Sequence, residues 1–394
     1  MSSVAGIQQA ATRASQSVQI EPVTDPKGVM EVIEFPFKLY KNDHNWVPPF
    51  IEERRDFLDP KKNPFYEHGK VQLFLARRHG EVVGTIGAAI NYSHNTVHNE
   101  KAGAFGYFET IDDQEVASVL LRAAEEWVRA EGMTIIRGPM TFSLNDECTL
   151  LVSGDDDPPV AMMTYNPLYY AGLIEAAGYQ KAMDFYAYLG DLDERLHNAP
   201  PKVFHAAEKA AARRGITVRK GRMSEFNKEA EIIRSVMNQA WSKNWGFVPL
   251  TDHEVEHLGK NLKQLVDPDL VLIAETSDGK PVGISLTLPD VNQALKRAGG
   301  GHMFPFGLLK YLWYAKINRK INRVRLVLMG VVEDYRMLGI DAIFYVQTAR
   351  IALSKGYYHL EGSWILETNT MMNRIIERLG GRRYKTYRIY EKNV

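Results

Sequence analysis

The sequence predicts an α/β (α+β) protein that contains the same unit twice, each unit having a mixed, mostly antiparallel central sheet flanked by helices. Three observations lead to this prediction. The chain has 394 residues, which is long for one domain and ample for two. Its hydrophobic content of 45% is enough for each half to bury a core. Strand-like and helical apolar patterns also follow one another in the same order twice along the chain.

The first copy opens on a hairpin and closes with a strand that follows a helix. Two acidic residues, Asp112 and Asp113, precede a periodic apolar run from Val116 to Trp127, which is the pattern of an amphipathic helix. The predicted elements are a helix at about 26–41, an irregular segment Asn45–Pro64, strands Val71–Arg78 and Val82–Ile90 joined by His79-Gly80, strand Ala102–Phe108, helix Val116–Ala130, strand Thr134–Arg137, helix Pro167–Ala177 closed by Gly178, and strand Ala182–Leu189.

The second copy repeats this order after an additional strand and two helices. It also carries an insertion, at about 290–320, that has no counterpart of that length in the first copy. The predicted elements are strand Ile216–Lys220, helices at about 225–243 and 252–266, strand Leu270–Thr276, turn Asp278-Gly279, strand Pro281–Leu288, the insertion, strand Arg323–Val332, helix Gly339–Ser354, strand Tyr357–Gly362, helix Asn369–Leu379 followed by Gly380-Gly381, and strand Tyr384–Tyr390.

The order of elements, the turn positions and the Asn before each late helix (Asn166 and Asn369) agree between the copies. This agreement favours a duplicated supersecondary unit over chance similarity. The chain is therefore expected to divide into a flexible N-terminal tail at 1–20, an N-terminal domain at 21–191, a linking helix at 192–214 and a C-terminal domain at 215–394.

The charge of the chain is balanced, with 48 Lys and Arg against 48 Asp and Glu. This balance argues against a dedicated nucleic-acid binder, because a phosphate backbone favours a basic excess. A local basic stretch, Lys310–Arg325, has two interpretations. It could meet a phosphorylated ligand, or it could be a solvated helix face, and the second interpretation is the favoured one.

Cysteine and histidine usage exclude several kinds of site. Cys148 is the only cysteine, so an intrachain disulfide and a cysteine-rich zinc site are impossible, and a packed thiol is favoured over a nucleophile. The 11 histidines show no HxxxH or HxH spacing, so no metal is expected.

The sequence shows no recognisable targeting signal, so the cytoplasm is the default location. No apolar run approaches the ~20 residues of a membrane span. The segment Met1–Gln19 lacks the apolar core and basic flank of a secretory signal. We therefore expect a cytoplasmic protein without a membrane span, whose oligomeric state is unknown from sequence.

The turn between strand Arg323–Val332 and helix Gly339–Ser354 is the best candidate for binding a cofactor's phosphates. A strand that leads through a tight turn into a helix points several free backbone N–H groups at one place, with the positive end of the helix dipole behind them. Gly339 lacks a Cβ, so the backbone there can approach a pyrophosphate closely.

The second copy resembles the GNAT acyl-CoA N-acyltransferase family at this turn. That family carries Gln/Arg-x-x-Gly-x-Gly/Ala here. Arg336 and Gly339 match the pattern, Asp341 stands where the second Gly or Ala is usual, and Ala342 comes one place later. The resemblance covers about 270–392 well and 71–190 in outline. Paired GNAT units in one chain also occur in N-myristoyltransferase and mycothiol synthase.

The resemblance implies acetyl-CoA or another acyl-CoA as co-substrate. Its pyrophosphate would lie on the N–H groups of the turn. Its pantetheine arm would pair like an extra strand with the backbone at the end of the long strand, where the sheet splays and one N–H would act as oxyanion donor. The expected cofactor-binding residues are Met329, Val331, Arg336, Met337, Leu338, Gly339, Ile340, Asp341, Ala342 and Asn369.

Asp341 departs from the family pattern and has two interpretations. Facing the pyrophosphate at about 6 Å, its carboxylate would cost roughly 3 kcal/mol per charge pair at an effective dielectric constant of about 20. Pointing away, it would simply favour the helix N-terminus. The equivalent turn of the first copy, Thr110–Glu115, has no glycine and three acids, so any single CoA site belongs to the second copy.

Candidates for proton transfer lie at the strand ends that border the splay. The family often uses a Tyr on its closing helix as acid, but the matching residue here is Ile376. Tyr384 or Tyr387 could substitute for it, although core packing is the favoured role of both. Glu333 and Glu367 are the candidate bases, each weighed against a solvated loop carboxylate.

The acceptor is expected to be a small-molecule amine or an amino-acid-like compound. Ser363 and Trp364 are plausible walls of its site in the second copy. In the first copy, acids beside aromatics could hold a cationic amine, although a turn with a helix cap explains them as well. The first-copy candidates are Asn145, Asp146, Glu147 and Tyr165.

Two functional hypotheses from different classes remain. The first is an acyl-CoA-dependent N-acyltransferase of the acetyltransferase type. The second is a GNAT-derived CoA-binding or sensor protein without turnover, which Asp341 and Ile376 motivate. Aminoacyl-tRNA-dependent transfer is disfavoured by the balanced charge.

Overall fold

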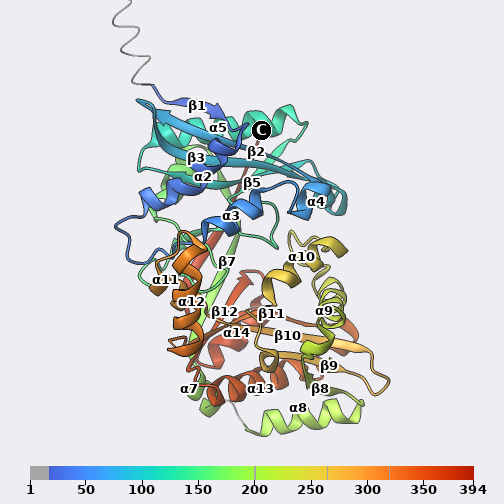
Figure 1. Cartoon of the computed structure of the whole chain (residues 1–394). Coiled ribbons are helices and arrows are strands. Elements are labelled where there is room, and N and C mark those ends of the chain that lie inside the picture. The colour runs from blue at the N-terminus through green and yellow to red at the C-terminus, as the bar shows by residue number, and fades with distance from the viewer. Residues whose placement is uncertain (1–16, 199–200, 264, 319) are drawn as a thin grey trace, which may run out of the picture. The chain divides into compact units, whose positions relative to one another are not determined.

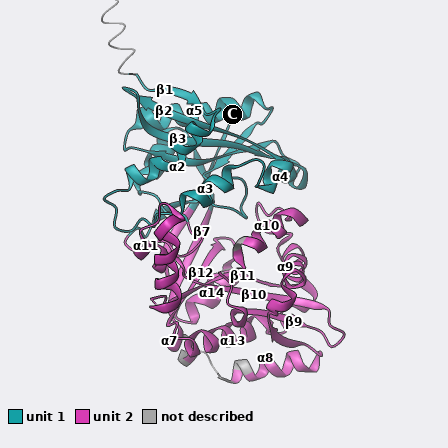
Figure 2. Ribbon diagram, viewed as in Figure 1, with its two compact units in different colours: residues 1–155, 164–183, 388–394 teal, residues 156–163, 184–387 magenta. Residues whose placement is uncertain are grey.

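The computed structural model describes residues 17–198, 201–263, 265–318 and 320–394 (Figure 1). The chain forms two compact units (Figure 2). Unit 1 comprises Met1–Asp155, Thr164–Met183 and Arg388–Val394, and unit 2 comprises Asp156–Met163 and Asp184–Tyr387. Each unit has a mixed, mostly antiparallel sheet with helices against it, which confirms the expected fold class.

Unit 1 is built on the sheet order β1-β2-β3-β4-β5-β13. All neighbours pair antiparallel except β4 and β5, which are parallel. Its elements are β1 (Gln19–Pro22), α2 (Pro26–Leu39), α3 (Ile51–Leu58), η1 (Pro64–Glu67), β2 (Gly69–Arg78), β3 (Glu81–Asn91), α4 (Tyr92–His98), β4 (Ala102–Thr110), α5 (Gln114–Ala130), β5 (Ile135–Gly138), β6 (Leu150–Ser153) and α6 (Tyr169–Ala176), with parts of β7 (Gln180–Asp191) and β13 (Arg382–Asn393).

The helix α5 shows how the sequence pattern produces the core of unit 1. Val116, Leu120, Ala124 and Val128 recur every four residues, so they share one helix face, and all four are fully buried against the sheet. Asp113 caps the helix by accepting hydrogen bonds from two backbone N–H groups of its first turn.

Unit 2 is built on the sheet order β7-β12-β11-β10-β9-β8, in which only β11 and β12 are parallel. Its elements are α7 (Leu192–Asn198), α8 (Pro201–Arg213), β8 (Thr217–Lys220), η2 (Met223–Glu225), α9 (Phe226–Trp241), α10 (Asp252–Leu262), η3 (Pro268–Leu270), β9 (Val271–Glu275), β10 (Pro281–Pro289), α11 (Asn292–Ala298), η4 (Met303–Gly307), α12 (Leu308–Leu312), η5 (Trp313–Ile317), β11 (Arg323–Val331), η6 (Glu333–Tyr335), α13 (Ile340–Ser354), β12 (His359–Leu366) and α14 (Thr370–Arg378).

Two groups of helices cover the two faces of the sheet in unit 2. The helix α13 packs with α8 on one face, where Phe344 is fully buried beside Leu272 of β9. The helix α9 packs on the other face, where Val236 meets Ile273 and Ile284. The sheet therefore has two apolar sides, which explains the nearly continuous burial of β9 and β10.

The compact units do not follow the order of the sequence repeats. Residues Asp184–Asp191 of β7 belong to unit 2, where the strand pairs with β12. Residues Arg388–Asn393 of β13 belong to unit 1, where Tyr390–Asn393 pair with β5. The last strand of each repeat thus completes the sheet that contains the other repeat. The division at 21–191 and 215–394 stays a prediction drawn from the repeats.

Three predicted segments differ in detail from the structure. The irregular segment Asn45–Pro64 contains the helix α3, whose few turns are too short for apolar periodicity to reveal. The linking helix expected at 192–214 contains two helices, α7 and α8, and residues 199–200 between them lie outside the described residues. Most of the expected tail at 1–20 also lies outside them, but Gln19 already begins β1, which pairs with β2.

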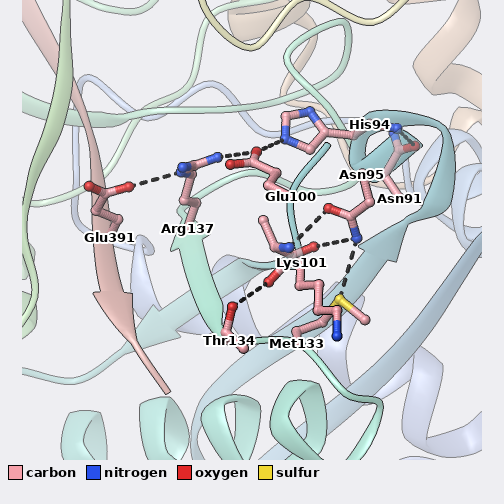
Figure 3. Close-up of polar contacts among 10 residues, drawn as sticks. Asn91, His94, Asn95, Glu100, Lys101, Met133, Thr134, Arg137 and Glu391 are labelled. Atoms are coloured by element: carbon pink, nitrogen blue, oxygen red, sulfur yellow. Dashed lines mark hydrogen bonds and ion pairs between the residues drawn. The ribbon is translucent and has the colours of Figure 1, made fainter. Parts of the chain in front are cut away.

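A polar network joins the C-terminal strand to unit 1 (Figure 3). Arg137 of β5 donates from Nε to Glu391 Oε2 of β13 at 2.9 Å and from Nη1 to Glu100 Oε1 at 2.5 Å. Glu100 also lies 2.5 Å from His94 Nε2 of α4. Burial alone would raise the pKa of Glu100, but its hydrogen bonds with Arg137 and His94 outweigh burial and lower it.

Replacing Arg137 tests this network. Arg137→Met leaves two half-buried carboxylates without their cation, so we expect the free energy of unfolding at neutral pH to fall by about 1–3 kcal/mol in urea denaturation. The loss should shrink as pH falls below 4.5, the ordinary pKa of Glu100, because protonated Glu100 no longer needs the guanidinium.

Lys62→Met is the matched control for this prediction. Lys62 pairs with Asp56 at the surface, where both side chains are 47% exposed, so its removal should cost less than about 1 kcal/mol. Equal losses in the two variants would contradict a special role for the Arg137 network.

Candidate active site

The parallel strands at the centre of unit 2 separate halfway along their length. β11 and β12 pair only from Arg323 and His359 to Leu326 and Gly362, although β11 continues to Val331 and β12 to Leu366. Beyond that point β11 stays paired with β10, and β12 stays paired with β7. Among the described strands, none pairs with the facing edges beyond this point, so an extended ligand could pair with them.

The corresponding separation in unit 1 is filled by the chain itself. There β4 and β5 pair only from Ala102 to Ala104 on β4. The backbone N–H of Met140 then donates to Phe105 O at 2.7 Å. A Cβ on Gly106 would lie 2.4 Å from Met140 O, so the backbones touch there. Unit 1 therefore leaves no equivalent space for a pantetheine arm.

The turn before α13 has the features of an anion-binding site. Within the described residues, the backbone N–H groups of residues 337–342 have no hydrogen-bond partner, whereas Ile343 N–H already donates to Gly339 O. Gly339 holds a φ of +75°, and a Cβ on it would lie 2.5 Å from the Ala207 Cβ. Free N–H groups at the N-terminus of a 15-residue helix are suited to phosphate.

Arg336 supports this turn from the side. Its Nε donates to Val331 O at 3.2 Å, and its Nη2 donates to Ala240 O at 2.9 Å. The guanidinium therefore connects the end of β11 with the end of α9 and fixes the path of the turn. Met337 follows with a φ of +65° and a 90% exposed side chain.

The equivalent turn of unit 1 is closed to anions. Asp113 accepts hydrogen bonds from the N–H groups of Glu115 and Val116, and Arg78 pairs with both Asp113 and Glu115. The donors that a phosphate would need are thus occupied by a carboxylate of the chain.

A buried polar cluster lies where β11 and β12 begin to separate. Arg325 and Glu361 are opposite each other in the parallel pair, with exposed side-chain fractions of 3% and 0%, and Arg325 Nε lies 3.7 Å from Glu361 Oε2. Ser363 Oγ donates to Glu361 Oε2 at 3.0 Å. Arg325 is further held by Ala161 O at 2.7 Å, and Tyr384 OH lies 3.5 Å from Glu361 Oε1.

The burial of this cluster changes the acidity of its carboxyl groups. Burial raises the pKa of Glu361 to about 7, although the nearby Arg325 opposes the shift. Burial likewise raises the pKa of Asp290 to about 6, although Arg323 and a hydrogen bond from Ala161 N–H oppose it. Glu361 is therefore a carboxyl group that can gain or lose a proton near neutral pH.

Two hydrogen-bond donors beside this cluster are unsatisfied. Trp364 Nε1 and Tyr387 OH are buried, and neither has a partner among the described residues. The rings of these residues are in edge contact at 6.1 Å, and the Arg325 guanidinium lies 5.4 Å from the Trp364 ring. Buried donors without partners are costly in the free protein, so they are natural contacts for a ligand.

The predicted residues of unit 2 fall into two groups. Ser363, Trp364 and Tyr384 come together around Glu361. Glu333 lies apart from them on η6, where it is 61% exposed; a hydrogen bond from Lys243 Nζ lowers its pKa. Glu367 is half-buried after β12 and accepts a hydrogen bond from Asp184 N–H at 3.1 Å.

Two other sets of predicted residues have structural partners. Asn369 caps α14 by accepting a hydrogen bond from Met372 N–H at 3.3 Å. The candidates from the first copy lie in unit 1 and bond within it: Glu147 makes a bidentate pair with Arg54, Asp146 accepts from Ser143 Oγ, Asn145 N–H donates to Ser143 Oγ, and Tyr165 donates to Asp43.

Sequence reasoning missed Glu361 and Arg325. Arg325 was grouped with the basic stretch Lys310–Arg325, which is not one solvated helix face, because Arg325 is buried on β11. The signal that could have identified both residues is a charged side chain inside an otherwise apolar strand, since such a residue needs a partner on the neighbouring strand. Asp290 was missed as well, whereas Tyr387 had been named with Tyr384 as a possible acid.

No group of three or more His, Cys, Asp or Glu side chains within the described residues could hold a metal ion. No helix in the described part of the chain combines the length and apolar character needed to cross a bilayer.

Solved structures share this architecture over nearly the whole chain. A tandem GNAT protein from the clavulanic acid biosynthesis pathway superposes with a TM-score of 0.57 at 11% identity, covering 96% of this chain and 98% of that one. A GCN5-related N-acetyltransferase from Sphaerobacter thermophilus gives a TM-score of 0.52 at 15% identity, covering 95% of each chain. The chain therefore has the tandem GNAT fold.

Curated relatives place the chain more narrowly. It is 39% identical over 380 residues to the bacterial ceramide synthase of Caulobacter vibrioides (strain NA1000 / CB15N), covering 95% of this chain and 97% of the relative. It is 38% identical over 367 residues to Protein YghO of Escherichia coli (strain K12), covering 92% of each. The chain belongs to the family of these two proteins, and the expected enzyme class, an acyltransferase, is confirmed. No family model matches the sequence.

The raised pKa of Glu361 predicts how pH acts on stability. The ordinary value is 4.5 and the folded value is about 7, so between them the folded state binds more protons than the unfolded state. Stability therefore falls as pH rises through this window. Glu361→Gln keeps a neutral side chain of the same shape. We expect its free energy of unfolding, relative to wild type, to rise by roughly 2 kcal/mol from about pH 5 to about pH 8.

Urea unfolding at several pH values measures this difference. Glu126→Gln, on the exposed side of α5, controls for the chemistry of the substitution. A constant difference between Glu361→Gln and wild type across the whole pH range would contradict the raised pKa.

Proposed function

We propose that the chain is an acyl-CoA-dependent N-acyltransferase that joins a fatty acyl group to the amine of a long-chain base, giving a ceramide. The observation that carries the proposal is the buried Glu361, whose pKa of about 7 suits a base, at the point where β11 and β12 separate. The 39% identity to a bacterial ceramide synthase supports a lipid amine as acceptor. A long-chain base is a more specific acceptor than the small-molecule amine expected from the sequence.

The acyl-CoA is proposed to bind along the turn and the separated strands. The pyrophosphate would meet the free N–H groups of Leu338–Ala342. The pantetheine arm would lie along the edge of β11 near Met329 and Val331, where Met329 O already accepts from Trp241 Nε1 at 3.3 Å and Val331 O from Arg336 Nε at 3.2 Å. Asp341 lies in the first turn of α13, with a half-buried side chain. An aspartate at that place favours the helix, and it tolerates the phosphate when its carboxylate points away.

The proposed reaction is a direct transfer. The amine nitrogen attacks the thioester carbonyl carbon, a C–N bond forms, the C–S bond breaks, and CoA leaves as the thiolate. Glu361 takes the proton that the nitrogen loses, and the thiolate receives one proton to become the thiol. Burial and the Glu361 charge raise the pKa of Tyr384 well above its usual value, so its phenol stays neutral and is a weaker acid than the protonated Glu361, which would pass its proton on to the thiolate.

Gly339 provides a test of acyl-CoA binding. Its positive φ and its closeness to Ala207 mean that Gly339→Ala must move the turn. We expect calorimetry to show acyl-CoA affinity reduced at least about tenfold, the equivalent of about 1.4 kcal/mol. Gly356→Ala is the matched control at the other end of α13, since Gly356 has a φ of +86° and nothing within 4 Å of its Cβ position.

The control variant should bind acyl-CoA as wild type does. Equal weakening in both variants would mean that general strain, and not the turn, governs affinity. Wild type that binds neither acetyl-CoA nor a long-chain acyl-CoA would refute the proposed co-substrate.

Glu361 provides a separate test of the chemistry. With a long-chain base and a long-chain acyl-CoA, Glu361→Gln should lower kcat by about 10²–10⁴-fold in a thiol-release assay while acyl-CoA still binds. Glu333→Gln and Glu367→Gln carry the same change at the two bases predicted from sequence, and both should keep kcat close to wild type. If Glu361→Gln stays active and one of the controls loses most of its kcat, the glutamate replaced in that control would be the base. Acyl-CoA binding without thiol release by wild type would indicate a binding protein.

A further inference from the structure

The insertion between β10 and β11 carries an exposed apolar surface. It contains α11, η4, α12 and η5, and in Figure 1 α11 and α12 are drawn in orange. Exposed fractions of its large apolar side chains run from 53% to 67%, whereas side chains of these types are usually buried. These residues form what we term the insertion surface: Phe304, Phe306, Leu309, Trp313 and Ile317.

The insertion surface is ordered along one helical run. Leu309, Trp313 and Ile317 are four residues apart on the continuous stretch formed by α12 and η5, so they share one face. Phe304 and Phe306 precede them on η4, which contacts α12. An apolar face that includes Trp and Phe and has water on one side is typical of a helix lying at a membrane interface.

The charged residues of the insertion itself have one sign. No acidic residue stands between Asp290 and Glu333, although acidic and basic residues balance at 48 each over the chain. Arg297, Lys310, Lys316 and Lys320 are exposed, and none of them forms an ion pair within the described residues. Exposed cations without partners beside an apolar face favour an anionic partner.

We infer that the insertion surface binds the surface of an anionic phospholipid bilayer. The apolar side chains would enter the acyl boundary, and the lysines would meet the phosphate groups, with their apolar stems against the protein. A second copy of the chain fits less well, because a two-fold contact would bring this cationic rim against itself. Bilayer binding is independent of the proposed reaction.

The base of the insertion touches the Glu361 cluster. Asp290 N–H, at its start, donates to Arg323 O at 2.9 Å, and Asp290 and Arg323 both act on the pKa of Glu361. If the proposed function holds, a lipid amine reaching the protein from the bilayer would enter close to the carboxyl group that takes its proton. This part of the inference rests on the proposed function.

Vesicle sedimentation with the full chain tests the inference. The probes are phosphatidylcholine vesicles and vesicles with phosphatidylglycerol as a minor component. Wild type should sediment with the anionic vesicles and much less with the neutral ones. Lys310→Glu with Lys316→Glu should reduce the partition coefficient on anionic vesicles by about tenfold or more, since each lysine near such a surface contributes roughly a fivefold factor.

A second pair of variants tests whether binding needs the apolar side chains of the insertion surface or any exposed apolar side chain. Leu309→Asp with Trp313→Asp should abolish sedimentation, and both side chains are exposed, so the fold should be kept and is checked by thermal melting. Met371→Asp is the matched control, since Met371 is 64% exposed on α14, outside the insertion. It should bind as wild type does.

Three outcomes would overturn the inference. They are wild type that binds neither vesicle, insertion variants that bind as wild type, and a control that loses binding to the same extent. Sedimentation velocity of the same proteins tests the alternative that a second copy of the chain binds this surface. The surface would belong to a contact with a second copy if wild type self-associates without binding vesicles and the Leu309→Asp, Trp313→Asp variant does not self-associate.

Discussion

The limited pairing of β11 with β12 is the constraint on which the site in unit 2 depends. Four residue pairs hold the strands together, and the ladder then stops at Leu326 and Gly362. Backbone groups that leave a ladder need other partners. On β12 the next residues shift register against β7, and this irregular stretch carries Ser363 and Trp364 beside Glu361. The same break therefore opens an edge for a ligand and gathers the polar side chains next to it.

The two repeats show what happens when such a break is closed or left open. In unit 1, Met140 occupies the freed acceptor on Phe105, so the protein satisfies its own backbone. Unit 1 also has a buried glutamate, Glu109, whose pKa burial raises to about 7. Both of its neighbouring phenols, on Tyr40 and Tyr170, donate to it at 2.5 and 2.8 Å. A carboxyl group held by two donors of its own chain is a structural feature.

Glu361 in unit 2 also accepts from its own chain, from Ser363 Oγ at 3.0 Å and Tyr384 OH at 3.5 Å, but it differs from Glu109 in what lies beside it. Its near neighbours Trp364 and Tyr387 keep unpaired donors, and the turn before α13 keeps free N–H groups. Unsatisfied donors lower the stability of a free protein and are retained where a ligand pairs with them. The two turns therefore differ: in unit 1 Asp113 pairs with the N–H groups of its own helix, whereas the N–H groups before α13 are left without partners within the described residues.

The sequence predicted the fold well because its signals are local. Amphipathic runs such as Val116–Trp127 and turns such as Asp278-Gly279 depend on neighbours in the chain. The sequence did not predict that β7 and β13 each pair in the sheet of the other repeat, since no residue pattern within a strand specifies which sheet that strand joins. The turn at Gly339 could be predicted because its mechanism is also local. The pair Arg325 and Glu361 could not be predicted, because the two residues are far apart in the sequence and only the parallel register of β11 and β12 brings them together.

The charges around Glu361 explain why a buried carboxyl group suits an amine with an apolar tail. Arg325 stays charged in any protein environment, and carbonyl groups of Ala161 and Ser363 help to hold it. An ammonium group that loses its proton to ionised Glu361 turns two buried charges into two neutral groups. In a medium of low dielectric constant, removing both charges avoids much of the cost of keeping them away from water. In the proposed reaction, burial would therefore favour the proton transfer that makes the amine nucleophilic, and an apolar tail on the acceptor would strengthen that burial by excluding water.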